Sequence, residues 1–191
     1  MDKFIKKLKS KEKRSIIEII ALMSYSPSIG RALEKGGVKK FQKMAVRIAG
    51  NLNKIKKIED FDRLHKRWVG KIREKIKTNK NRKSSIGQAQ KAINVFLKLL
   101  VDWARLPDKR ISKRLLPFLH VPLDNILMEE IWENYPYFYE REIRPLQKKS
   151  NSNLSLAKID MAEYLEWQKF FRKKHPKKPL LFDIAWAINR G

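Results

Sequence analysis

Apolar residues recur every three or four positions over much of this chain, and that spacing predicts amphipathic helices. The clearest stripe lies within residues 38–55. Its members are Val38, Phe41, Ala45, Ile48, Leu52 and Ile55. A second stripe of the same kind follows within residues 61–76. It consists of Phe61, Leu64, Trp68, Ile72 and Ile76. We therefore predict two consecutive helices, the second of them capped by Asp60.

The apolar residues at positions 16–23 form a nearly unbroken run rather than a periodic stripe. Such a run is typical of a helix that is buried on most sides, so we predict that it forms the central helix. Ser10 is the predicted N-cap, and the Ser-Pro-Ser sequence at 26–28 should end the helix. A short helix at 29–35, closed by two glycines, should follow.

Four more helices are predicted in the second half of the chain. Ser84 or Ser85 caps the most apolar of them, and Pro107 ends it. Pro122 is expected in the first turn of the next helix. In order, the four cover residues 86–106, 122–135, 154–174 and 179–190.

The fold class that follows is all-α, because no segment alternates apolar and polar residues as a strand does. We expect a compact bundle of about seven to nine helices. A single domain over residues 1–191 is the default for this length. The alternative is two small lobes, residues 1–83 and 84–191, that meet at the polar loop near 78–85.

Charge is the most unusual feature of the composition. The chain has 45 Lys and Arg against 20 Asp and Glu, a formal net charge of +25. This excess exceeds what solubility requires and indicates a polyanionic partner. The first hundred residues hold 28 basic and 8 acidic side chains, so they carry most of the excess. The basic surface is therefore expected mainly in the first half.

The basic residues of the first half fall largely opposite the two apolar stripes and in the loop that follows them. We predict that they bind the phosphates of DNA or RNA largely without regard to sequence. The predicted contact residues are Lys39, Lys40, Lys43, Arg47, Lys54, Lys57, Arg63, Lys66, Arg67, Lys71, Arg73, Lys77, Arg82 and Lys83. The alternative for each of them is an ordinary solvated surface.

A narrow polar stripe lies on the predicted apolar helix at 86–106. Lys91, Asn94 and Lys98 follow one another at i, i+3 and i+7, which places them on one helical face. Further along, His120 and Asp124 flank a predicted helix start. One interpretation is a helix cap beside a hydrogen-bonded buried histidine; the other is a functional pocket. That pocket would comprise Gln90, Lys91, Asn94, Lys98, His120 and Asp124.

The same residues carry a resemblance to a group of uncharacterised prokaryotic proteins. The matching pattern is Ala89-Gln90-Lys91 with Asn94 and Lys98, followed by His120-Val121-Pro122-Leu123-Asp124, over about forty residues. No activity comes with this resemblance. It implies only that these positions belong together.

Signatures of catalysis and of cofactor or metal binding are otherwise missing. The three histidines lack metal-ligand spacing, and the chain has no cysteine and no phosphate-binding glycine loop. We therefore expect no cofactor and no metal, and favour a non-catalytic protein. The alternative is a metal-dependent nuclease or phosphoryl-transfer enzyme whose carboxylates hold Mg²⁺. Its candidate ligands are Glu129, Glu130, Glu133 and Asp124.

The sign of the charge reverses between Asp124 and Glu142, where acidic residues outnumber basic ones. This acidic stretch is expected to pair with the basic helices of the protein or to bind a protein partner. A third functional hypothesis is accordingly an interaction protein whose positive face docks an acidic protein or an anionic membrane. No transmembrane segment is predicted, since the apolar run at 16–23 is short and contains Glu18.

Two further expectations come from composition and aromatic residues. The absence of cysteine suits an intracellular, cytoplasmic protein, and the wealth of charged residues would suit a thermophile. Aromatic residues on apolar stripes are expected in the core, as are the remaining tryptophans, Trp103, Trp132, Trp167 and Trp186. Tyr135, Tyr137 and Tyr139 are the candidates for an exposed platform that stacks on unpaired bases, with a cluster at the core edge as the alternative.

Overall fold

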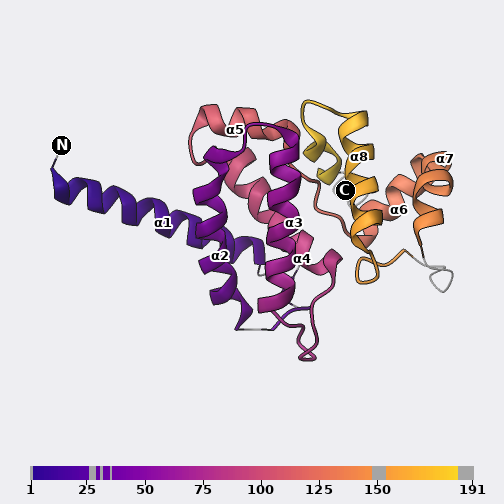
Figure 1. Cartoon of the computed structure of the whole chain (residues 1–191), viewed down its shortest axis with the longest axis horizontal. Coiled ribbons are helices and arrows are strands. Elements are labelled where there is room, and N and C mark those ends of the chain that lie inside the picture. Colours follow the sequence, from indigo (N-terminus) through magenta and orange to yellow (C-terminus); the bar gives the residue numbers. More distant parts are fainter. Residues whose placement is uncertain (1, 26–28, 31, 35, 148–153, 185–191) are drawn as a thin grey trace.

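A computed structural model describes residues 2–25, 29–30, 32–34, 36–147 and 154–184, and over these residues the fold is all-α (Figure 1). It contains nine helical segments, eight of them with seven or more residues, and no strand among the described residues. Two isolated β-bridges, Leu33 with Thr78 and Lys77 with Lys83, are the exceptions to helical pairing. The predicted fold class and helix number are confirmed.

Helix α1 (Lys3–Tyr25) packs on α2 and α4 with its C-terminal part, while its N-terminal part extends away from the body (Figure 1). Ile17, Ile20 and Ala21 are buried, but Ile16 and Ile19 are exposed. The prediction of a central helix buried on most sides was therefore wrong. Ser10 lies inside α1 and is not its N-cap. Residues 26–28 lie outside the described part of the chain.

Helices α2 (Gly37–Asn51) and α3 (Ile58–Lys75) lie side by side in front of α4 (Figure 1). A short 3-10 turn, Leu52–Lys54, leads from one to the other. The two predicted apolar stripes face the core. Every stripe residue is buried except Val38 and Leu64, which are half-buried. Regular spacing of apolar residues thus predicted both helices correctly.

Two predictions for the chain around these helices were wrong. Asp60 is not an N-cap, because α3 begins at Ile58; its carboxylate accepts a hydrogen bond from the backbone N–H of Lys56 at 3.3 Å. The helix predicted at 29–35 is also wrong. The described residues there form turns, and Leu33 pairs with Thr78 in an isolated bridge.

Helix α4 (Ile86–Leu97) is the most deeply buried helix and continues as a π-helix over Lys98–Trp103. Ser85 is its N-cap as predicted. The Ser85 hydroxyl accepts from the backbone N–H of Gln88, and the Gln88 side chain accepts from the backbone N–H of Ser85. This capping box satisfies two of the N–H groups that a helix start leaves without a partner.

The chain then continues in shorter helical segments. They are α5 (Lys109–Leu115), α6 (Asn125–Asn134), α7 (Pro136–Phe138) with its π-helical continuation Tyr139–Ile143, α8 (Met161–Lys174) and a 3-10 segment, Pro179–Ile184. Pro122 precedes α6 rather than starting it, since Asp124 is the N-cap. The last helix was predicted at 179–190. The structure has a 3-10 segment there up to Ile184, and residues 185–191 lie outside the described part.

Buried apolar side chains form two clusters. The first gathers α1 to α5 and includes Phe41, Phe61 and Phe96; the second gathers α6 to α8 and includes Trp167 and Phe171. Along the chain the change from one cluster to the other falls at His120, which belongs to neither. The division of the chain into lobes stays a prediction, but the seam between these clusters is where the polar residues described below lie.

The aromatic residues depart from expectation at two tryptophans. Trp167 is buried and Trp68 is 6% exposed, as predicted, but Trp103 is 65% and Trp132 42% exposed. Trp186 lies outside the described residues. Of the three tyrosines, Tyr137 alone is largely exposed, Tyr139 is buried, and Tyr135 packs against Phe170. The three tyrosines thus do not share one exposed surface.

Candidate nucleic-acid interface

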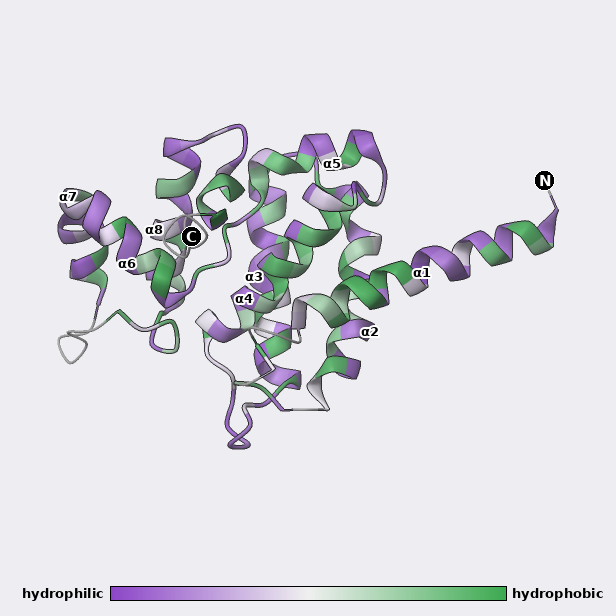
Figure 2. Cartoon of the chain, turned by 180° about the vertical axis from the view of Figure 1, so that it is seen from behind, coloured by the Kyte–Doolittle hydropathy of each residue, from purple (hydrophilic) through white to green (hydrophobic). Residues whose placement is uncertain are grey.

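The candidate interface is the outer surface of α2 and α3. Because their apolar stripes face the core, the basic residues between the stripe positions turn toward solvent. Lys39, Lys43 and Arg47 are exposed along α2, and Lys66 and Lys71 along α3. Figure 2 shows polar residues on both helices in the view from behind. We call the outer surface of these two helices the basic face.

Few of the fourteen predicted contact residues are neutralised by the protein itself. Within the described residues, only Lys40 and Arg63 form ion pairs, with Glu34 at 2.8 Å and with Asp60 at 2.8 Å. The Arg73 side chain is half-buried, and its Nε donates to the Ser84 carbonyl at 3.1 Å. The other members stay exposed to solvent. The basic face therefore keeps most of its charge available to a partner.

The loop after α3 extends this basic surface. Lys77, Arg82 and Lys83 are exposed there. The loop turns at Asn81, whose φ of 56° lies in the left-handed region that asparagine tolerates better than most residues. The backbone N–H of Thr78 donates to the Arg82 carbonyl at 2.7 Å and closes the turn. The loop is thus a defined structure that presents three cations.

A groove of about 240 Å³ separates α3 from α8 beside the basic face. Arg63 and Lys66 line it from α3, and Lys169 and Arg172 from α8. Three of these four cations already have carboxylate partners: Arg63 with Asp60, Lys169 with Glu166 and Arg172 with Asp62. The groove therefore adds little unpaired positive charge to the basic face.

The residues of the predicted pocket come together only in part. Gln90, Asn94 and His120 meet in a buried network around Tyr164, at the seam between the two apolar clusters. Asn94 Nδ2 lies 2.7 Å from Gln90 Oε1 and 3.0 Å from the Tyr164 hydroxyl, and His120 Nδ1 lies 2.6 Å from that hydroxyl. Asn94 and His120 are each 1% exposed. These side chains are therefore bonded to the protein itself.

The hydrogen bonds of this network run in one direction. The Asp62 carboxylate can only accept, so His120 Nε2–H donates to it at 2.9 Å and His120 Nδ1 accepts from the Tyr164 hydroxyl. The Tyr164 oxygen then accepts from Asn94 Nδ2, and Asn94 Oδ1 accepts from His65 Nε2–H at 2.7 Å. Every donor in this chain thus finds an acceptor with both histidines neutral.

Burial sets the protonation states in the network. It lowers the pKa of His65 well below the ordinary 6.5, and the neighbouring His120 lowers it further. Burial also lowers the pKa of His120 to about 4, although the hydrogen bond to Asp62 opposes this. Desolvation would raise the pKa of Asp62, but hydrogen bonds from His120 and Arg172 reverse the effect and lower it. Asp62 is therefore ionised beside two neutral imidazoles.

Arg172 closes the outer end of the network. Its guanidinium binds both oxygens of Asp62, at 2.7 and 2.9 Å, and donates to the Phe118 carbonyl at 2.7 Å. A paired arginine and carboxylate at a partly buried site give a directional contact between α3 and α8. The network therefore fixes how the two apolar clusters meet.

The three charged members of the predicted pocket lie apart from this network. Lys91 pairs with Asp124 at 3.1 Å, and Lys98 pairs with Asp183. Asp124 also accepts from the backbone N–H of Leu127 at 2.9 Å, as an N-cap does. The interpretation of Asp124 as a helix cap beside a hydrogen-bonded buried histidine is therefore confirmed for both residues.

Four residues of the network were not predicted: Asp62, His65, Tyr164 and Arg172. His65 carried a usable signal, because it lies next to Leu64 on the apolar side of α3, where a polar residue needs a partner. The other three carried none. Asp62 is one acidic residue among several at the start of α3, and Tyr164 and Arg172 are separated from it by about a hundred positions.

The acidic residues of the second half do not converge. Among the described residues, no three or more His, Asp or Glu side chains gather in a way that could hold a metal ion. Glu129 and Glu133 are exposed on α6, and Glu140 pairs with Arg144 at 2.6 Å. We therefore derive no metal-dependent step from these carboxylates.

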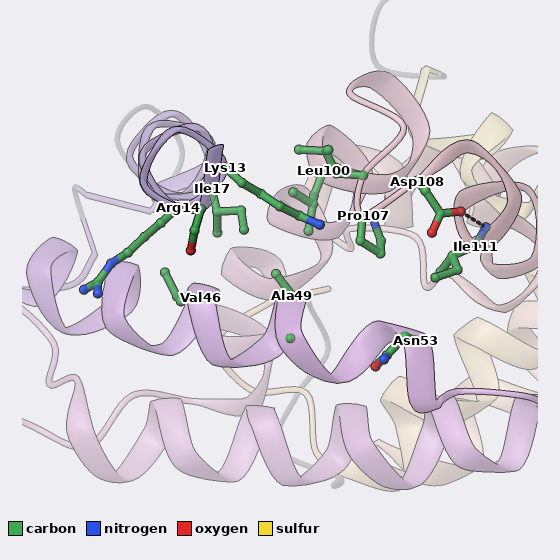
Figure 3. Close-up of a pocket in the computed structure, with 13 residues that line it drawn as sticks. Lys13, Arg14, Ile17, Val46, Ala49, Asn53, Leu100, Pro107, Asp108 and Ile111 are labelled. Carbon is green, nitrogen blue, oxygen red and sulfur yellow. Dashed lines mark hydrogen bonds between the residues drawn. The ribbon is translucent and has the colours of Figure 1, made fainter. Parts of the chain in front are cut away.

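A cavity lies under α1, where this helix leaves the body (Figure 3). It has a volume of about 390 Å³ and an apolar floor that includes Leu100 and Ile111. Lys13 points across it from α1, while Asp108 is engaged as the N-cap of α5 through the Ile111 N–H at 2.8 Å. The buried part of α1 begins at this cavity, with Ile17.

The fold and the site together define an all-helical protein with a basic face on two helices and a polar seam between two apolar clusters. Comparisons with family models, with curated proteins and with solved structures give no match for this chain. None of the helices in the described residues has the length and apolar character needed to cross a bilayer.

Proposed function

We propose that the protein binds nucleic acid without catalysis, through contacts between its basic face and the phosphate backbone. The observation that carries this proposal is the low degree of internal neutralisation: α2 and α3 expose cations side by side, and only Lys40 and Arg63 among the fourteen pair with carboxylates of the described residues. Cations that stay hydrated and unpaired can release counterions from a polyanion when they bind it.

The contacts expected of this face are sequence-independent. Lysine and arginine side chains on the outer sides of two neighbouring helices can reach phosphates, but such contacts read no base edges. We therefore expect similar affinities for unrelated sequences.

Binding measured at two salt concentrations tests the proposal. Labelled duplexes and single strands of two unrelated sequences would be titrated with the protein at low and at physiological salt. We expect binding that is about equal for the two sequences and that weakens steeply as salt rises. The proposal fails if neither polymer binds, or if the affinity does not respond to salt.

A further inference from the structure

Helix α1 has two apolar faces, and the body of the protein covers only one of them. Ile17, Ile20 and Ala21 point into the first cluster. The other face consists of residues that are between 39% and 61% exposed. They are Phe4, Ile5, Leu8, Ile16, Ile19, Leu22 and Met23. We call these seven residues the outer apolar face.

The outer apolar face forms one stripe when the helical repeat is applied. At 100° per residue, its members fall within about a third of the helix circumference, centred well over 90° from the buried residues. Glu12 and Ser15 interrupt the stripe between Leu8 and Ile16. The stripe has no partner among the described residues. On ordinary protein surfaces exposed apolar residues are scattered singly, whereas here seven of them lie on one face.

Basic residues border this face on both sides. Lys9 and Lys13 lie on one flank, and Lys7, Lys11 and Arg14 on the other, as the helical repeat places them. Over Lys3–Tyr25 there are seven basic and two acidic side chains. The whole segment from 2 to 16 is exposed, and this part of α1 stands clear of the body (Figure 1). An apolar stripe between two cationic flanks is the pattern of helices that lie in the plane of a membrane surface.

We propose that α1 binds the surface of an anionic lipid membrane through its outer apolar face. The seven apolar side chains would enter the boundary between headgroups and acyl chains, and the flanking lysines would contact lipid phosphates. A second copy of the chain is the less suitable occupant. Two such helices would bring their cationic flanks together within a protein whose net charge is +25.

This binding surface is separate from the basic face of α2 and α3. The basic face would also be attracted to an anionic vesicle by its charge. Substitutions of apolar residues on α1 are therefore the ones that distinguish binding through the outer apolar face. Substitution of Leu8, Ile19 and Leu22 by Gln removes apolar area from the outer face without changing charge. All three are at least 45% exposed, so the fold should be kept.

The test is co-sedimentation of the full chain with vesicles of phosphatidylcholine alone and of phosphatidylcholine mixed with phosphatidylserine. We expect binding to the mixed vesicles, weakened at least about tenfold by the triple variant Leu8→Gln, Ile19→Gln, Leu22→Gln. The matched control is Leu146→Gln, Leu181→Gln, Ile184→Gln, which changes the same residue types at exposed positions elsewhere and should bind as the unmodified protein does.

Two results would overturn the proposal. One is equal binding of the triple variant and the unmodified protein to mixed vesicles, because binding would then be a matter of charge alone. The other is a dimer in analytical ultracentrifugation without lipid that the triple variant converts to a monomer, because a second copy would then cover this face. Nucleic-acid binding by the triple variant is expected to be unchanged, which separates this test from that of the basic face.

Discussion

The hydroxyl of Tyr164 lies 2.6 Å from Nδ1 of His120, although 44 positions separate the two residues in the sequence. Tyr164 belongs to α8 and to the second apolar cluster, whereas His120 stands between the clusters along the chain. Their hydrogen bond is the centre of the network that ends in Asp62 and His65 on α3. This network resembles catalytic arrangements in its residue types, but its inner side chains are buried and hydrogen-bonded to one another, and we infer that it serves to set how the clusters meet.

Asn94 is the residue on which most of this network depends. Its side chain binds His65, Gln90 and Tyr164, so Asn94→Ala leaves several buried groups without partners. We expect the free energy of unfolding to fall by about 3 kcal/mol. Urea denaturation measures this change in the free energy of unfolding. Asn134→Ala is the matched control, because that amide is exposed and binds only the Glu130 carbonyl among the described contacts; it should change stability by less than about 0.5 kcal/mol.

Stability should fall as the pH falls from about 6.5 toward 4. In the folded protein the pKa of His120 is about 4, and in the unfolded chain it returns to about 6.5. Above pH 6.5 neither state takes up the proton. Between the two values the unfolded chain binds it and the folded protein does not, so unfolding becomes more favourable. His120 alone can account for roughly 3 kcal/mol, and the lowered pKa of His65 acts in the same direction.

Unfolding by urea at a series of pH values tests this dependence. His120→Gln should flatten the decline between pH 6.5 and 4, whereas His175→Gln, which changes a histidine outside the network, should leave it in place. Asp62 contributes in a different window: because its pKa is lowered in the folded protein, its share is present above about pH 4 and lost below it. An unchanged slope in His120→Gln would contradict the role given to His120.

The helices that were predicted correctly have apolar residues at regular spacing. The predictions that failed depend on how segments distant in the sequence pack together. The stripes of α2 and α3 face the core because period and face are local properties. At residues 16–23 every residue but Glu18 is apolar, so apolar side chains surround most of the helix and the sequence does not say which side the body covers. Ile19 is exposed and Ile20 buried for this reason.

The candidate site was predictable to a similar extent. Asn94 stood out as a polar residue in an apolar helix, and so did Gln90 beside it. Their partner Tyr164 comes from 70 positions away, and its place depends on how α8 packs against α4. The basic residues needed no such knowledge, because a charged residue opposite an apolar stripe is exposed whatever the stripe packs against.

Gly87 marks a close approach between the start of α4 and the chain at Leu156. A Cβ at position 87 would lie 1.8 Å from the Leu156 carbonyl oxygen, a backbone atom that cannot move aside easily. We expect Gly87→Ala to lower stability by about 2–3 kcal/mol. At Gly70 in α3 a Cβ meets nothing within 4 Å, so Gly70→Ala should raise stability by about 0.5–1 kcal/mol. Thermal and urea unfolding of both variants measure the contrast, and equal effects would refute the close contact.

Asp124 has two contacts that substitutions can separate. Asp124→Asn keeps an oxygen for the Leu127 N–H but loses the charge that pairs with Lys91; Asp124→Ala loses both. We expect a loss of about 0.5 kcal/mol for the first and about 1.5 kcal/mol for the second. Chemical denaturation gives these values. Nucleic-acid affinity should stay within about twofold, and a large loss of affinity with intact stability would instead favour the functional pocket.

Three cations of α2 should contribute more to nucleic-acid binding than three cations elsewhere. Lys39→Gln, Lys43→Gln and Arg47→Gln together remove three charges from the basic face and keep good helix formers. If each cation meets one phosphate, the slope of log affinity against log salt concentration should decrease in magnitude by about 2–3.

The matched control removes the same charge from α5 through Lys109→Gln, Arg110→Gln and Lys113→Gln, all exposed positions. Fluorescence anisotropy at four or more salt concentrations, with a duplex and a single strand, gives both slopes. We expect the α5 variant to change the slope by less than half as much. Equal changes would mean that the total charge attracts the polymer and that the basic face has no special part in binding it, because contact with specific phosphates requires particular cations.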